Sequence, residues 1–139
     1  LLDMNLCGNM RSSEFVSMFL LCPDICESLE YLDICETRFS TSAMSRVLQL
    51  MPNLQHLDVS DTDADDDLLE VVSQSNTKLS YLAVGGCINT SNAGIKQVVE
   101  KCPQLQVVDI AECPFIDDFA YLEANNIELE IDSEYDTIH

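Results

Sequence analysis

The chain has 139 residues, of which 25 are Asp or Glu and 6 are Lys or Arg, so its formal net charge is −19 and its pI is near 4.1. Such a charge repels nucleic acid and anionic membrane surfaces and favours basic partners. Hydrophobic residues make up 47% of the chain, yet no apolar run reaches the roughly 20 residues that a membrane span needs. We therefore expect one globular domain that binds neither nucleic acid nor a membrane.

Helix-like segments recur along the chain. Apolar residues at helical spacing predict helices over 12–22, 41–51, 65–75 and 91–102. Ser12 or Ser13 is expected to cap the first helix and Ser91 or Asn92 the last, because short polar side chains bind the first backbone N–H groups of a helix. A following proline is expected to end three of these helices, at Pro23, Pro52 and Pro103.

Between the helices lie short segments with alternating apolar residues, as in strands with one buried face. The clearest are SLEYLDICET (28–37), MPNLQHLDVSDT (51–62), KLSYLAVGGC (78–87) and KCPQLQVVDIAEC (101–113). Their central residues belong to a column with intervals of 21 to 30 residues, made up of Leu2, Leu32, Leu57, Leu82, Val108 and Leu129. This interval, with the recurring pattern L-x-x-L-x-L-x-x-C/N, is typical of a repeat solenoid.

The stretch KCPQLQVVDIAECPFIDD (101–118) closely fits the pattern C-P-x-L-x-x-L-x-L-x-x-C-x-x-I-T-D-x-x-L, and CINTSNAGI (87–95) and TDADDDLL (62–69) are looser copies. In this the chain resembles the cysteine-containing class of leucine-rich repeats. The resemblance implies an α/β leucine-rich-repeat solenoid of about five to six repeats. Its short parallel strands would line the concave side and its helices the convex side.

That class resembles the substrate-recognition arms of F-box leucine-rich-repeat proteins and related ubiquitin-ligase adaptors. The resemblance implies a cytoplasmic or nuclear protein-interaction module that recognises a substrate, with cullin-ligase subunits bound through a region absent from this chain. We expect residues 1–139 to form one leucine-rich-repeat domain, the C-terminal part of a longer array. Residues 126–139 would then serve as its terminal cap and acidic tail.

The cysteines recur at two positions of the repeat and form no C-x-x-C pair. One position precedes the prolines and holds Cys22 and Cys102, with Met51 between them in the series. The other closes the strand-like segments and holds Cys7, Thr37, Thr62, Cys87 and Cys113. We expect reduced structural thiols that fill gaps and donate weakly to backbone, with Cys35 the most accessible.

Catalytic and metal-binding signals are weak. DTDADDD (61–67) lacks the Gly and the Glu that a calcium loop carries at its sixth and twelfth positions, so we interpret it as a loop followed by a helix N-terminus. The sequence holds no nucleophile-and-base motif, no phosphate-binding Gly-rich loop and no paired zinc ligands. We therefore expect no enzyme activity, no cofactor and no metal site.

The residue after each central apolar residue faces away from the core in this arrangement. Adjacent strands lie about 4.8 Å apart, so these residues form a mostly acidic ladder of Asp3, Asp33, Asp58, Ala83, Asp109 and Glu130. Glu36, Asp61 and Glu112 form a second acidic line at the strand ends. We interpret the two lines as a docking surface for a basic segment of a protein partner, the alternative being simple solvation.

One position earlier, the open face carries Tyr31, His56, Tyr81 and Val107, which are suited either to binding hot spots or to cross-strand packing. At AVGG (83–86) the small residues are expected to leave a shallow hollow between the acids, unless the glycines serve only the turn. The predicted partner-binding residues are Tyr31, Asp33, His56, Asp58, Asp61, Tyr81, Gly85, Asp109 and Glu112. The alternative function is that of a stand-alone acidic repeat protein that binds basic proteins as an inhibitor or escort.

Overall fold

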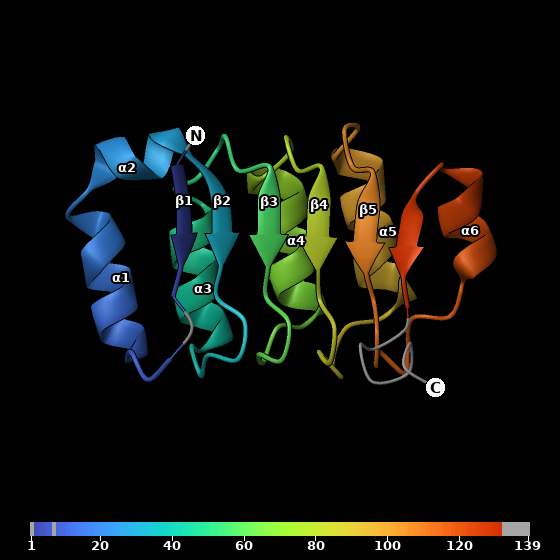
Figure 1. Ribbon diagram of the computed structural model, residues 1–139, viewed down its shortest axis with the longest axis horizontal. Coiled ribbons are helices and arrows are strands. Elements are labelled where there is room, and N and C mark those ends of the chain that lie inside the picture. Colours follow the sequence, from blue (N-terminus) through green and yellow to red (C-terminus); the bar gives the residue numbers. More distant parts are fainter. Residues whose placement is uncertain (1, 7, 132–139) are drawn as a thin grey trace.

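The computed structural model describes residues 2–6 and 8–131, which form one parallel sheet with helices along one side (Figure 1). The six strands lie side by side in chain order. They are β1 (Leu2–Asn5), β2 (Leu29–Asp33), β3 (His56–Asp58), β4 (Tyr81–Ala83), β5 (Val107–Asp109) and β6 (Glu128–Glu130). This order, with a helical crossover between neighbours, is that of an α/β solenoid, as the sequence predicts.

The helices α3, α4 and α5 cover the rear of the sheet, and α1 and α6 lie at its two ends in Figure 1. The bounds are α1 (Ser12–Leu20), α2 (Pro23–Ser28), α3 (Thr41–Leu48), α4 (Asp66–Ser75), α5 (Asn92–Lys101) and α6 (Phe119–Ala124). The stretch that lengthens the first repeat forms α2, with Pro23 in its first turn. Among the described residues, no helix is both long and apolar enough to cross a membrane.

The register of the sheet aligns equivalent residues of successive repeats. Leu32 pairs with Leu57, and Leu57 with Leu82, as the sequence pattern predicts. All three are fully buried, because alternate residues of each strand point toward the helices. Each such leucine contributes about 1.5–3 kcal/mol relative to an exposed side chain.

The first strand corrects the sequence alignment. Met4 pairs with Leu32 and Asn5 pairs with Asp33, so the assignment of Leu2 and Asp3 to these two columns is wrong. A shift of two residues leaves the alternation of apolar and polar residues unchanged, so this alternation cannot detect it. Cys7, which was placed from the same alignment, lies outside the described residues.

A repeated turn ends the strands. Thr37 and Thr62 donate their hydroxyls to the backbone carbonyls of Ile34 and Val59 at 2.8 and 2.6 Å. In later repeats a cysteine replaces the threonine, and its thiol reaches a carbonyl of the preceding repeat over 3.1 Å in both cases, Cys87 to Val59 and Cys113 to Val84. These contacts confirm the structural role predicted for Cys87 and Cys113. Burial raises the pKa of both thiols, which keeps them protonated.

Helix starts follow the sequence prediction only in part. Asp65 caps α4 through a bond from the Leu68 N–H, so the acidic run does lead into a helix. The predicted cap at Ser12 or Ser13 is wrong, because α1 begins at Ser12 and its hydroxyl accepts the N–H of Ser40 instead. Tertiary contact between neighbouring repeats has replaced the local cap.

The N-terminus of α5 is likewise held by the preceding repeat. Ser91 occupies the predicted cap position, but its side chain makes no capping bond within the helix. Its hydroxyl and its N–H both donate to the carboxylate of Asp66, at 2.5 and 2.9 Å. Gly94 follows on the same helix, and a Cβ there would overlap Asp66 Oδ1 and lie 2.8 Å from Leu69 Cδ1. Close approach of α4 and α5 therefore requires glycine at this position.

Asn76 links two repeats in the core. It is fully buried at the end of α4 and donates its side-chain amide to the carbonyls of Leu48 and Met51, both at 2.9 Å. It stands at the repeat position held by Met51 and Cys102, and the thiol of Cys102 in turn approaches the Asn76 carbonyl at 3.5 Å. The side chain of Asn76 thus ties the C-terminal end of α3 and the turn after it to the next repeat.

Replacing Asn76 by alanine should lower the free energy of unfolding by about 1–3 kcal/mol, because two buried hydrogen bonds are lost, although each carbonyl keeps one backbone N–H donor. Urea denaturation measures this difference. Asn125→Ala is the matched control, since Asn125 makes one bond of the same kind, to the Tyr121 carbonyl, but at an exposed position. Its loss should stay below about 1 kcal/mol. Equal losses in the two variants would contradict the assignment.

Candidate interaction face

Three aromatic side chains stack across the open face of the sheet. The rings of Tyr31 and His56 have centroids 4.0 Å apart, and those of His56 and Tyr81 are 4.2 Å apart and within 2° of parallel. The sheet register pairs these residues directly, which brings their side chains together. Cross-strand packing therefore accounts for this predicted column, and it also fixes the three half-buried rings in place. We call them the aromatic ladder.

Tyr81 also connects the aromatic ladder to a strand that is not adjacent to its own. Its hydroxyl donates to the Glu130 carboxylate over 3.1 Å, which joins β4 to β6 across β5. Burial raises the pKa of Tyr81, and the carboxylate of Glu130 raises it further. The phenol therefore remains a neutral hydrogen-bond donor at physiological pH. Residue Glu130 belongs to the predicted acidic ladder but not to the predicted partner-binding set.

The imidazole of His56 lies between the two tyrosines. Burial lowers its pKa below the ordinary value of 6.5, and the negative charges of Asp58 and Asp33 oppose this shift only in part. The ring is therefore neutral at pH 7, when it stacks between two neutral phenols. The aromatic ladder carries no charge of its own, whereas the positions beside it are acidic.

The acidic ladder starts at Asp33 and not at Asp3, because Asn5 is the residue of β1 that pairs with Asp33. Its aspartates serve the turns as well. Asp33, Asp58 and Asp109 each accept the N–H of the residue two positions later, at 2.8 to 3.0 Å. One oxygen of each carboxylate is thereby held in place at the end of its strand. For Asp109, burial raises the pKa, and the nearby charge of Glu130 adds to that effect. The hydrogen bonds of the turn thus favour aspartate at these positions. From the sequence alone we predict only its contribution to surface charge.

The second acidic line lies on the turns themselves. Glu36, Asp61 and Glu112 are exposed and have φ values of 55° to 60°, a left-handed conformation that is uncommon for residues with a side chain. Gly86 occupies the same position in its repeat with φ 73°. A Cβ at Gly86 would overlap the carboxylate of Asp61, so this glycine is required by the turn and by its neighbour.

The hollow expected at AVGG differs from the prediction. Ala83 is buried, with 1% of its surface exposed, and so does not open the face. Gly85 is half-buried, and a Cβ there would lie 3.4 Å from the Ala111 carbonyl and from Asp109 Oδ1. Atoms of the neighbouring repeats therefore surround Gly85 and leave little open space above it. The role of Gly85 in partner binding stays a prediction.

One group of side chains has the spacing of metal ligands among the residues that the structure describes. The ligand atoms of Asp33, Cys35 and Asp58 all lie within 4.8 Å of one another. Asp33 and Asp58 each already accept a backbone N–H. Structural zinc sites use four protein ligands, and this group offers three. The thiol of Cys35 is half-buried, as is that of Cys22, so the prediction that Cys35 is the most accessible is not confirmed.

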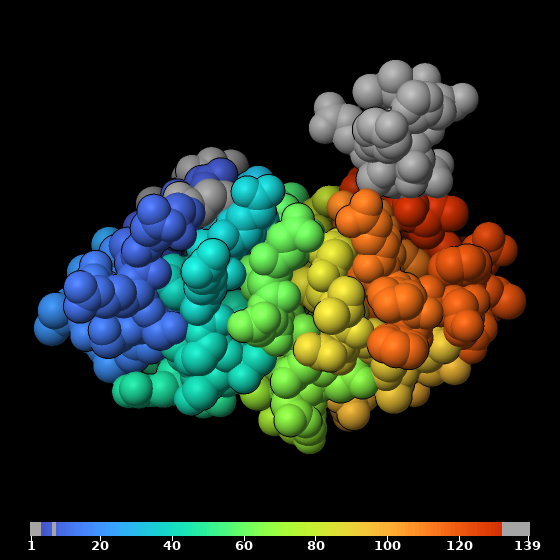
Figure 2. All heavy atoms as spheres, turned by 90° about the horizontal axis from the view of Figure 1, so that it is seen from below, coloured from blue at the N-terminus to red at the C-terminus, as the bar shows by residue number. Residues whose placement is uncertain are grey.

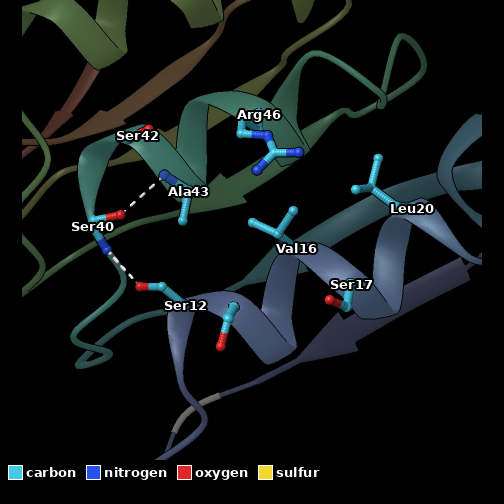
Figure 3. Close-up of a pocket in the computed structure, with 9 residues that line it drawn as sticks. Ser12, Val16, Ser17, Leu20, Ser40, Ser42, Ala43 and Arg46 are labelled. Carbon is cyan, nitrogen blue, oxygen red and sulfur yellow. Dashed lines mark hydrogen bonds between the residues drawn. The ribbon is translucent and has the colours of Figure 1, made fainter.

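A cavity of about 350 Å³ lies on the helical side, between α1 and α3 (Figure 3). Figure 3 shows Val16 and Leu20 of α1 facing Ala43 and Arg46 of α3, with the bond between Ser12 and the Ser40 backbone near one end. Its lining is small and polar or aliphatic, with one cationic side chain and no carboxylate, thiol or imidazole. It therefore offers no acid–base pair, and it is separate from the aromatic and acidic ladders.

Comparison with known proteins supports the repeat assignment. No family model matches the chain. A curated relative is F-box/LRR-repeat protein 4 from Bos taurus, which is 32% identical over 117 residues. The match covers 81% of this chain but 18% of the relative, so the chain spans under a fifth of that protein.

Two solved structures have the same fold. The crystal structure of a TLR13–ssRNA13 complex matches 79% of this chain and 16% of its own with a TM-score of 0.58 at 11% identity. The Rad7 and Elc1 complex in yeast matches 92% of this chain and 46% of its own, with a TM-score of 0.55 at 10% identity. The chain therefore has the fold of a leucine-rich-repeat solenoid, and its repeats resemble those of F-box leucine-rich-repeat proteins.

Proposed function

We propose that the chain is a protein-interaction module and that its open sheet face binds the partner. The observation that carries this proposal is the aromatic ladder of Tyr31, His56 and Tyr81, with carboxylates on the adjacent column. The rings are already stacked, so little side-chain freedom is lost when a partner covers them. Rigid aromatic side chains of this kind are enriched at the centres of protein interfaces.

The charge beside the ladder indicates which partner the face would accept. Asp33 pairs in register with Asp58, and Asp109 pairs with Glu130, so like charges occupy neighbouring strands. At about 5 Å in water-like surroundings, each such pair repels by roughly 1 kcal/mol. A segment with Lys or Arg would relieve this repulsion by pairing with these carboxylates. The proposed partner is therefore a protein with a basic segment.

Within a longer protein, we propose that this face recognises the substrate of a ubiquitin ligase. The similarity of this chain to part of an F-box/LRR-repeat protein supports this assignment. Cullin-ligase subunits would bind through a region outside these residues. The module would act by binding in the cytoplasm or nucleus, and the chemistry would take place elsewhere in the assembly.

The second candidate is an acidic escort or inhibitor of basic proteins. The net charge of −19 favours it, because such a field attracts basic proteins without any specific pocket. The two candidates differ in their dependence on salt. Exposed charge contacts weaken as the screening length falls from about 10 Å at 0.1 M to about 3 Å at 1 M salt. Contacts to the aromatic ladder persist under the same conditions.

Removing the carboxylates should weaken the binding of a labelled peptide of alternating Lys and Gly, followed by fluorescence anisotropy. Asp58→Asn and Asp109→Asn keep an oxygen that accepts the turn N–H, so the fold is preserved. Each should lower the affinity about two- to fivefold, the effect of one partly exposed charge pair. Glu100→Gln, an exposed residue on α5, is the matched control and should change it least. An equal loss with Glu100→Gln would show that only net charge matters.

Protonation of His56 should weaken the same peptide complex, because it places a positive charge beside Asp58. Burial lowers the pKa of His56, so this effect should be small at pH 7 and grow as the pH falls below 6.5. His56→Gln should lose this part of the pH dependence. A titration of the imidazole resonance by NMR checks the cause. A pKa of 6.5 or higher in the folded chain would contradict the buried, neutral ring.

Affinity capture from cytosolic and nuclear lysate, washed at low and then moderate salt, separates the two candidate functions. For a protein that includes the ligase-docking region, cullin-ligase components that survive the salt step are the expected result. Recovery only of basic proteins that are lost as salt rises would instead support the electrostatic escort.

A further inference from the structure

An apolar groove lies at the C-terminal end of the described repeats, at the edge where the strands finish. It has a volume of about 460 Å³ and is lined by Ile88, Ile110, Glu112, Cys113, Pro114, Ile116, Phe119 and Ile131. The turns after β4 and β5, the start of α6 and the residue after β6 supply this lining. Figure 2 views this edge and shows the yellow, orange and red segments side by side.

Large apolar side chains are exposed in the groove and beside it. Ile88 is 60% exposed, Phe119 39% and Ile131 46%, and Phe115 beside them in sequence is 62% exposed. Burying such surface would stabilise a complex by about 25 cal/mol for each Å² removed from water. Exposed apolar patches with a polar rim mark interaction sites in folded proteins.

Acidic residues lie in the groove lining and next to it in the sequence. Glu112 lines it, Asp117 follows the lining residue Ile116, and Glu130 precedes Ile131. A second copy of this chain, with its net charge of −19, is electrostatically disfavoured as the occupant. Residues 132–139 of this chain contain three acids and neither Lys nor Arg, so their charge is also unfavourable. Charge complementarity favours a segment that carries apolar and basic side chains together.

The groove adjoins the proposed binding face through two strands. Asp109 of the acidic ladder is followed by the lining residue Ile110, and Glu112 belongs both to the second acidic line and to the groove. Glu130, which holds the Tyr81 hydroxyl, is followed by Ile131. A single extended segment could therefore place cations along the acids and an apolar side chain in the groove.

We propose that this groove binds an apolar anchor of the partner, immediately next to the basic residues that the open face recognises. The proposal rests on the proposed function, since it assigns the anchor to the same basic segment. The recognised element would thus be a short stretch of Lys or Arg followed by a large apolar residue such as Leu or Phe. The acids would set its position, and the groove would add selectivity against peptides that are only basic.

Two labelled peptides test this assignment by fluorescence anisotropy. One has alternating Lys and Gly followed by Leu and Phe, and the other has Ser at both apolar positions. The full chain should bind the first about tenfold more tightly, as burial of one large apolar side chain would give. Ile88→Ser, at a mostly exposed position, should reduce this difference to less than about threefold and leave binding of the Ser peptide unchanged. Leu21→Ser, which is 81% exposed at the other end of the chain, is the matched control.

Each contrary outcome has a distinct meaning. Equal affinity for the two peptides, with both weakened by Asp58→Asn, would contradict the proposal that the apolar groove binds an anchor. The acidic face alone would then be the binding site. No binding of either peptide would overturn both proposals. Tighter binding of the apolar peptide by the full chain carrying Tyr135→Ser and Ile138→Ser would show that the chain's own C-terminal residues occupy the groove. A dimer in sedimentation that Ile88→Ser dissociates would assign the groove to a second copy.

Discussion

The turn that follows each strand is the constraint on which the repeats depend. In the second repeat, Asp33 accepts the Cys35 N–H, Glu36 takes a left-handed conformation and Thr37 donates to the Ile34 carbonyl. The chain thereby leaves the sheet at the same point in successive repeats and crosses to the helical side. Without this exit, neighbouring strands could not stay in register, and the buried leucines would not align. Hydrophobic burial supplies most of the stabilisation, but the turn determines where burial can occur.

The same turn accounts for the chemistry of the open face. An aspartate that holds a turn must sit at the end of its strand, and adjacent strands bring such aspartates together. The concentration of charge is thus a by-product of repetition, and its cost is small because the carboxylates remain partly solvated. Tyr31, His56 and Tyr81 show the corresponding effect for aromatic residues, since repetition places each ring over the next. Selection for a partner can then act on surfaces that the repeat has already built.

Repetition also explains which features could be predicted from the sequence. The columns through β2 to β6 follow from a fixed interval and an alternating pattern, and the structure confirms both. The two-residue shift of β1 could not be predicted from the sequence, because it leaves the alternation of apolar and polar residues unchanged. The bond from Tyr81 to Glu130 spans 49 residues, and the anchor groove joins Ile88 to Ile131. Such contacts depend on how far side chains reach across intervening strands, for which the sequence of one repeat carries no signal. The sequence carries only a weak signal for the role of Asn76, which is a polar residue at a repeat position that elsewhere holds Met51 or Cys102.

The bond between Tyr81 and Glu130 has a mechanical consequence. In a solenoid each repeat normally touches only its neighbours, so bending is opposed by one interface at a time. This bond ties together strands that are two repeats apart, and any change of curvature at β5 must stretch or compress it. We therefore expect this bond to oppose bending of the face between β4 and β6. A partner that binds there would meet strands that are held together beyond their nearest neighbours.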